Sequence, residues 1–94
     1  MDYKLLYHPD IVKEDLPEIP KNIQNIVRRA IEERILSNPI LYGHPLRHSL
    51  LGHRKLRVGD YRIIYRVQED EVIILKIGHR KDVYKKVLKR IRMK

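Results

Sequence analysis

The fold of this chain is decided by the stretch His53–Arg66, which reads HRKLRVGDYRIIYR. It places five Arg or Lys residues around a Gly59-Asp60 turn. Beyond the turn, apolar and aromatic side chains recur at every second position, as on one face of a β-strand: Tyr61, Ile63, Tyr65 and Val67. The pattern predicts a tight antiparallel hairpin with a concentrated positive charge.

From residue 53 onward, the sequence predicts strands over residues 53–58, 61–68 and 72–78. Both alternating sets of the third strand are mostly apolar, which is typical of a strand covered on two sides. A basic helix is expected over residues 82–92, with four apolar side chains toward the sheet: Val83, Val87, Leu88 and Ile91.

Upstream, residues 3–8 predict a short strand, and Asp10 is suited to cap a short helix. A longer amphipathic helix is expected over residues 21–36, followed by an irregular connection over 38–52 that holds two Pro and two Gly. The fold class is therefore α+β. An N-terminal strand and a helical hairpin pack on one face of a small curved antiparallel sheet, whose other face is free at its centre, and a short C-terminal helix follows.

Length and composition bound the kind of protein. The 94 residues predict a single domain, 1–94. The absence of Cys excludes disulfides and thiolate chemistry. No apolar run approaches the about 18 residues of a membrane span, and the N-terminus lacks the pattern of a signal peptide. A cytoplasmic protein without membrane contact is expected.

The charge is unevenly distributed. Residues 1–51 hold seven basic and seven acidic side chains, whereas residues 52–94 hold 14 basic and five acidic ones and carry the whole net charge of +9. Such asymmetry points to a partner rich in negative charge, which can be nucleic acid, an acidic protein or an anionic membrane. Nucleic acid or nucleoprotein is favoured, because phosphates reward clustered Arg and Lys. A basic surface that serves solubility alone is the alternative.

Two motifs carry a family resemblance: the stretch from Leu50 to Val67, with R-V-G-D-Y-R-I-I-Y, and the stretch from Val72 to Tyr84, with I-G-H-R. Both resemble the RelE/ParE superfamily of toxin–antitoxin toxins, and its RelE branch in particular. The upstream helices agree by pattern. The resemblance implies a fold like that of microbial ribonucleases, without their usual His/Glu catalytic pair.

The resemblance also implies a function. RelE-type toxins are metal-independent endoribonucleases, or mRNA interferases, that enter the ribosomal A site and cut mRNA there by attack of a ribose 2′-OH, which inhibits translation. The implied partners are the ribosome with its mRNA and a RelB-like antitoxin. Operator DNA is contacted only through the antitoxin complex. No metal or other cofactor is implied.

The resemblance implies catalytic roles for four residues that match the family motifs. Arg62 and Arg80 are expected to stabilise the charge of the transition state, because a guanidinium holds two phosphate oxygens at once. Lys55 is expected to serve as a base or as an electrostatic aid. Tyr84 is expected to stack on a base or to help proton transfer. Competing interpretations are a cross-strand ion pair of Arg62 with Asp60 or with a nearby Glu, and a purely structural Tyr84.

Two histidines are further catalytic candidates. His79 precedes Arg80, and an imidazole transfers protons near neutral pH, although an exposed strand-end His is the plain alternative. His53 occupies a position where the best-known RelE toxins have Lys, so it is an alternative candidate for the base. Basic residues beside these positions are expected to bind RNA: Arg54, Arg57, Lys81 and Lys85.

Two alternative functions remain open at this stage. A ParE-like toxin would inhibit gyrase without nuclease chemistry, and an inactive relic would only bind RNA. ParE-type chains usually lack the basic catalytic set present here.

Overall fold

The computed structural model describes residues 2–92, which form a five-stranded sheet of order β1-β5-β4-β3-β2. The strands are β1 (Lys4–Tyr7), β2 (His44–Pro45), β3 (Arg54–Val58), β4 (Tyr61–Gln68) and β5 (Glu71–His79). The helical segments are η1 (Ile11–Asp15), η2 (Leu16–Glu18), α1 (Lys21–Ala30), η3 (Ile31–Ile35), α2 (Pro39–Tyr42), η4 (His48–Leu50) and α3 (Val83–Arg92). The predicted α+β class and the three strands after residue 52 are confirmed.

The sheet is antiparallel from β2 to β5, but β1 pairs with β5 in parallel, Leu5 opposite Val72. A wholly antiparallel sheet had been expected. Tight turns join β3 to β4 and β4 to β5, and strands joined in this way run antiparallel. No such turn constrains β1, because the whole helical region separates it from β5.

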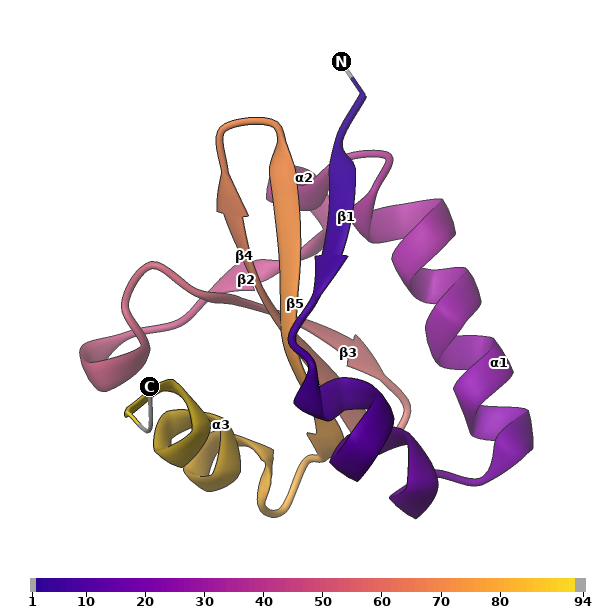
Figure 1. Cartoon of the computed structure of the whole chain (residues 1–94). Coiled ribbons are helices and arrows are strands. Elements are labelled where there is room, and N and C mark those ends of the chain that lie inside the picture. Colours follow the sequence, from indigo (N-terminus) through magenta and orange to yellow (C-terminus); the bar gives the residue numbers. More distant parts are fainter. Residues whose placement is uncertain (1, 93–94) are drawn as a thin grey trace.

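The first helical layer covers one face of the sheet (Figure 1). α1 and η3 form one continuous segment over residues 21–35, as its apolar stripe predicts. Its buried side chains meet the buried side chains of β3, β4 and β5. The main core lies here and includes Val27, Ile31, Ile35, Ile63 and Tyr65.

The opposite face of the sheet is partly covered by α3, as Figure 1 shows. Val83 and Val87 are fully buried against Ile64 and Leu75, and Leu88 and Ile91 pack around them. The inward face of α3 is therefore as predicted, but this second face of the sheet is less open at its centre than expected.

The connection from residue 38 to residue 52 is more regular than expected. Asn38 caps α2, since its Oδ1 accepts from the Leu41 N–H at 3.1 Å, and Pro39 starts this helix. Asp10, in contrast, makes no side-chain cap of η1. Its carboxylate lies 3.8 Å from His8 Nδ1 and 3.9 Å from Arg90 Nε instead.

Candidate functional site

Strand alternation assigns the basic side chains of β3 and β4 to two faces. Tyr65 and Ile63 point into the main core below α1, and Ile64 packs with α3 on the other side. Side chains at even positions of β4 and odd positions of β3 thus lie on the α3 side. We call this surface the basic face; it comprises Lys55, Arg57, Arg62 and Arg66, with Tyr84 of α3 beside them.

Arg57 and Arg62 stand directly opposite each other across β3 and β4. Like charges in such a pair destabilise a sheet. Within residues 2–92, neither forms an ion pair with a carboxylate. An external anion would remove this repulsion, so the arrangement favours binding of a negatively charged ligand.

The Gly59-Asp60 turn anchors both predicted catalytic arginines. Arg62 is only 9% exposed, and its Nη1 donates to the carbonyl oxygens of Gly59 at 3.0 Å and Tyr61 at 2.9 Å. The Arg80 N–H donates to the Asp60 carbonyl at 2.8 Å, and its Nε lies 3.5 Å from Asp60 Oδ1. Asp60 therefore pairs with Arg80, and the alternative ion pair of Arg62 with Asp60 is not formed.

Lys55 lies against Tyr84, which links the sheet to α3. The Lys55 Nζ is 5.6 Å from the centroid of the tyrosine ring, within the range of a cation–π contact. Tyr84 is partly buried and packs on the cluster of Ile64 and Val83. Lys55, Arg62 and Tyr84 are thus brought to one face, and Arg80 lies at its end beside the same turn.

Two predicted residues lie on the other face. The His79 ring makes an edge contact with Tyr61, its cross-strand neighbour, at 5.6 Å between centroids, and its Nδ1 accepts from the Lys81 N–H at 3.2 Å. Arg54 shares the face of Tyr65, and its Nη2 donates to the carbonyls of Ile40 at 2.6 Å and Gly43 at 2.7 Å. The structure does not bring these two side chains to Lys55 and Arg62.

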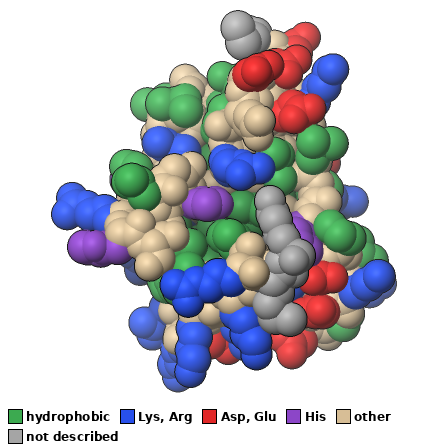
Figure 2. Space-filling model, turned by 60° about the vertical axis from the view of Figure 1, so that its left-hand side comes forward, with side chains coloured by type: hydrophobic (Ala, Val, Ile, Leu, Met, Phe, Trp, Pro, Cys, Tyr) green, Lys and Arg blue, Asp and Glu red, His purple; other side chains and the backbone are tan. Residues whose placement is uncertain are grey.

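The remaining predicted residues lie around the basic face. His53 is half-buried next to η4, with Nδ1 3.3 Å from the Leu50 carbonyl oxygen. Lys81, after β5, and Lys85, on α3, are exposed. Figure 2 looks onto the molecule from this side and shows Lys and Arg side chains gathered over its lower part, with exposed apolar side chains above them.

A buried ionic cluster beside α3 was missed from the sequence. Asp15 is 1% exposed and accepts from Lys76 Nζ at 2.6 Å, the Ile77 N–H at 2.9 Å and both Nη atoms of Arg90 at 2.8 and 2.9 Å. One signal was available: Lys76 interrupts an otherwise apolar strand, and a buried charge requires a partner.

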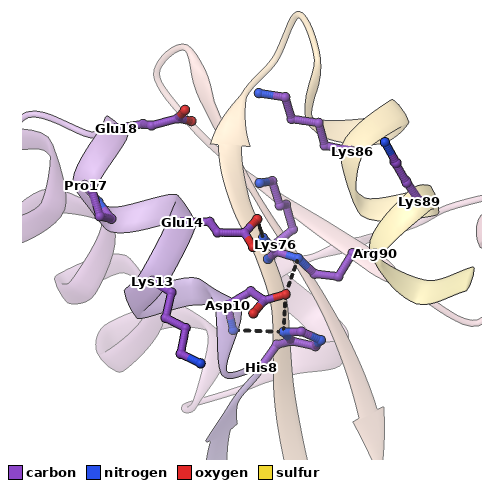
Figure 3. A pocket seen from close by; sticks show the side chains of 10 residues that line it. All are labelled: His8, Asp10, Lys13, Glu14, Pro17, Glu18, Lys76, Lys86, Lys89 and Arg90. Atoms are coloured by element: carbon purple, nitrogen blue, oxygen red, sulfur yellow. Dashed lines mark hydrogen bonds and ion pairs between the residues drawn. The ribbon is translucent and has the colours of Figure 1, made fainter. Parts of the chain in front are cut away.

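A cavity of about 680 Å³ borders this cluster between η1 and α3 (Figure 3). Its lining mixes both charges, with Asp10 and Glu14 on one wall and Lys86 and Lys89 on the other. It contains none of the residues of the basic face. In the part of the chain that the structure describes, no three His, Asp or Glu side chains are placed to hold a metal ion.

No helix within residues 2–92 is both long and apolar enough to traverse a bilayer. By fold and site, the chain is a small α+β protein with a face of arginine and lysine side chains that have no carboxylate partner within residues 2–92. This is the kind of surface that binds polyanions.

Comparison with known proteins identifies the family. The chain belongs to the ParE toxin family of type II toxin–antitoxin systems, whose sequence profile matches residues 6–84. It is 33% identical over 76 residues to toxin RelG of Mycobacterium tuberculosis, covering 79% of this chain and 87% of that toxin. The resemblance to the RelE/ParE superfamily is therefore confirmed.

Solved structures agree. The toxin–antitoxin complex RelBE2 of M. tuberculosis contains a chain with a TM-score of 0.77 and 28% identity, over 84% of this chain and 99% of that one. The RelB–RelE complex of Methanococcus jannaschii contains one with a TM-score of 0.66 and 30% identity, over 86% of this chain and 96% of that one. The RelE-like fold expected from the sequence is confirmed.

Proposed function

We propose that this toxin is a ribosome-dependent endoribonuclease that cleaves mRNA in the ribosomal A site and so inhibits translation. The observation that carries the proposal is the basic face. It holds two opposed arginines without a carboxylate partner, with Lys55 against Tyr84 and Arg80 beside the same turn. These residue types suit attack on a phosphodiester, because negative charge grows on the phosphate oxygens as the reaction proceeds.

In the proposed reaction, a ribose 2′-OH attacks the adjacent phosphorus and loses its proton. The bond to the 5′-oxygen breaks, which leaves a 2′,3′-cyclic phosphate, and the 5′-oxygen takes up a proton. Arg62 and Arg80 stabilise the pentavalent phosphorane, and Lys55 assists loss of the 2′-OH proton. The hydrogen bonds of Arg62 Nη1 to two carbonyls fix its guanidinium in advance of binding.

Tyr84 is assigned to stacking on a base next to the scissile phosphate. Its ring is partly exposed and is positioned by the hydrophobic cluster under α3. Base stacking on an aromatic ring is the usual way in which proteins hold single-stranded RNA. The proposed steps use side chains alone and require no metal ion.

We also assign a RelB-like antitoxin as the partner of this chain. Two of the similar structures are complexes of a toxin with its antitoxin. An acidic antitoxin segment would neutralise the basic face, and binding of operator DNA would occur only through that complex. The ribosome and its mRNA are the proposed targets of the free toxin.

The test is to map mRNA ends by primer extension in a translation reaction. The wild-type protein should produce cuts within the A-site codon. Arg62→Ala and Arg80→Ala should each slow cutting by about 10²- to 10³-fold, the usual cost of one transition-state donor. Arg34→Ala removes an exposed arginine from η3, on the other face, and should cut normally.

Intact mRNA with the wild-type protein, or normal cutting by the Arg62/Arg80 double variant, would overturn the proposal. The match to a profile named for ParE favours one second candidate, a toxin that inhibits gyrase without cleaving RNA. A gyrase supercoiling assay separates the two: inhibition of supercoiling together with intact mRNA identifies the ParE-like activity.

A further inference from the structure

Arg66 is a residue of the basic face to which the proposed reaction gives no role. It lies on β4 opposite Ile73 of β5, and Ile73 packs with the cluster under α3. The side chain is partly buried, and its Nε is fully buried without a hydrogen-bond partner. Within residues 2–92, the Arg66 side chain has neither an ion pair nor a hydrogen bond.

Arg54 is the natural comparison for the missing hydrogen bonds of Arg66. Arg54 also has a buried Nε without a partner, but its Nη2 donates to two carbonyl oxygens, so its guanidinium is held. The guanidinium of Arg66 makes no corresponding hydrogen bond within residues 2–92. A buried donor left unpaired destabilises the folded chain, and more so when it is charged. Because Nε is enclosed, an external acceptor can reach the guanidinium only at its two Nη atoms, neither of which is a buried unpaired atom.

The position of Arg66 indicates which ligand fits. It is four residues from Arg62 on the same side of the same strand, which corresponds to about 13 Å. The surface between them carries Lys55 on β3, which lies beside Ile64. A cationic track of this length can follow the backbone of a single-stranded RNA over a few nucleotides, and a guanidinium matches the geometry of a phosphate group.

We propose that Arg66 is a second phosphate-binding residue, which holds a backbone phosphate of the same RNA at a distance from the scissile one. This inference rests on the proposed function and extends it. Arg66 is a positioning residue, because it lies too far from Arg62 to touch the reacting atoms. It sets where the strand lies along β4, and its loss should weaken RNA binding more than it slows the chemical step.

Binding to an RNA that cannot be cut tests the inference separately from catalysis. The probe is a single-stranded RNA of about six nucleotides with 2′-O-methyl groups, titrated by fluorescence anisotropy from about 50 to about 300 mM salt. Arg66→Gln should weaken binding by about tenfold at low salt and reduce the slope of log K against log salt by about 0.7, the value for one phosphate contact on a single strand. Arg66→Lys should keep the slope and recover part of the affinity.

Arg34→Gln is the matched control, because it changes the net charge equally and lies on the opposite side of the sheet. Thermal denaturation of each variant verifies that it is folded. In the ribosome assay, Arg66→Gln should raise KM with kcat within about twofold of the wild type, whereas Arg62→Ala lowers kcat.

Three results would overturn the inference. They are equal binding by the Arg66 and Arg34 variants, absence of binding by the wild-type protein, and normal RNA binding by Arg66→Gln with a selective loss of antitoxin affinity. The last result would show that Arg66 binds a carboxylate of the antitoxin and not a phosphate of RNA. If the wild-type protein binds the probe through Arg66 but never cuts mRNA on ribosomes, the proposed nuclease function fails while the phosphate site stands.

Discussion

Gly43 shows how a single residue position constrains this fold. Its backbone is extended, with φ −91°, so its importance does not come from a left-handed conformation. A Cβ at this position would overlap the hydroxyl and ring of Tyr65. That hydroxyl is buried and donates to the Pro39 carbonyl at 2.7 Å, which ties β4 to α2.

Gly43→Ala should therefore destabilise the protein by about 1–3 kcal/mol, the usual cost of overpacking. Tyr65→Phe should cost about 1 kcal/mol through the lost hydrogen bond. Because removing the hydroxyl relieves part of the overlap, the double variant should be less destabilised than the sum of the two by at least about 0.5 kcal/mol. Urea denaturation measures all three, and strict additivity would contradict the packing explanation.

Tyr65 also makes stability depend on pH at the alkaline end. Burial raises the pKa of its hydroxyl above 10.0, against a smaller lowering by Arg54. The unfolded chain releases this proton first, so the contribution of Tyr65 is complete below pH 10 and is lost as the pH rises above it. The stability advantage of the wild type over Tyr65→Phe should shrink as the pH is raised from about 10 to about 11 in urea unfolding. An advantage that is constant over this range would contradict the raised pKa.

At the scale of elements, α3 is held on the sheet by more than its apolar face. The Arg90 guanidinium lies on the Asp15 carboxylate, which also binds Lys76 and the backbone of β5. Burial lowers the pKa of Arg90, but the hydrogen bonds and charge of Asp15 and the charges of Asp10 and Glu14 together outweigh it, so the pKa is raised overall. The cluster therefore joins η1, β5 and α3 at one carboxylate.

Asp15→Ala should destabilise the protein by about 3–5 kcal/mol, because it leaves two buried cations without their anion. Glu33→Ala is the control. It breaks the exposed pair with Arg29, 3.4 Å between Nε and Oε2, and should cost at most about 1 kcal/mol. Urea denaturation monitored by circular dichroism compares them. Equal effects of the two variants would show that the buried cluster does not hold α3.

At the scale of the whole molecule, the fold converts a charge asymmetry along the chain into one in space. The basic second half contributes β3, β4 and α3, which carry the basic face. The neutral first half contributes α1 and η3, which cover the other face. The proposed RNA path lies on the side of β3, β4 and α3, where the basic face is.

Much of this was accessible from the sequence. The period of two in β4 predicted its core face, the apolar stripe of residues 21–35 predicted the long helix, and the two motifs predicted the superfamily. These features depend on local geometry and on residues close in the chain. The same alternation places Arg54 on the face of Tyr65 and Lys55 on the opposite face of the sheet. Assigning these faces, however, requires the register of the hairpin.

The stretch His53–Arg66 by itself determined a basic hairpin and its Gly59-Asp60 turn, and together with the motif from Val72 to Tyr84 it indicated the superfamily. Only the tertiary structure decided which basic side chains share a face, that β1 runs parallel to β5, and that Asp15 meets Lys76 and Arg90. The physical reason is distance along the chain. Asp15 and Arg90 lie 75 positions apart, and a contact of that kind depends on how layers pack, which no local pattern records.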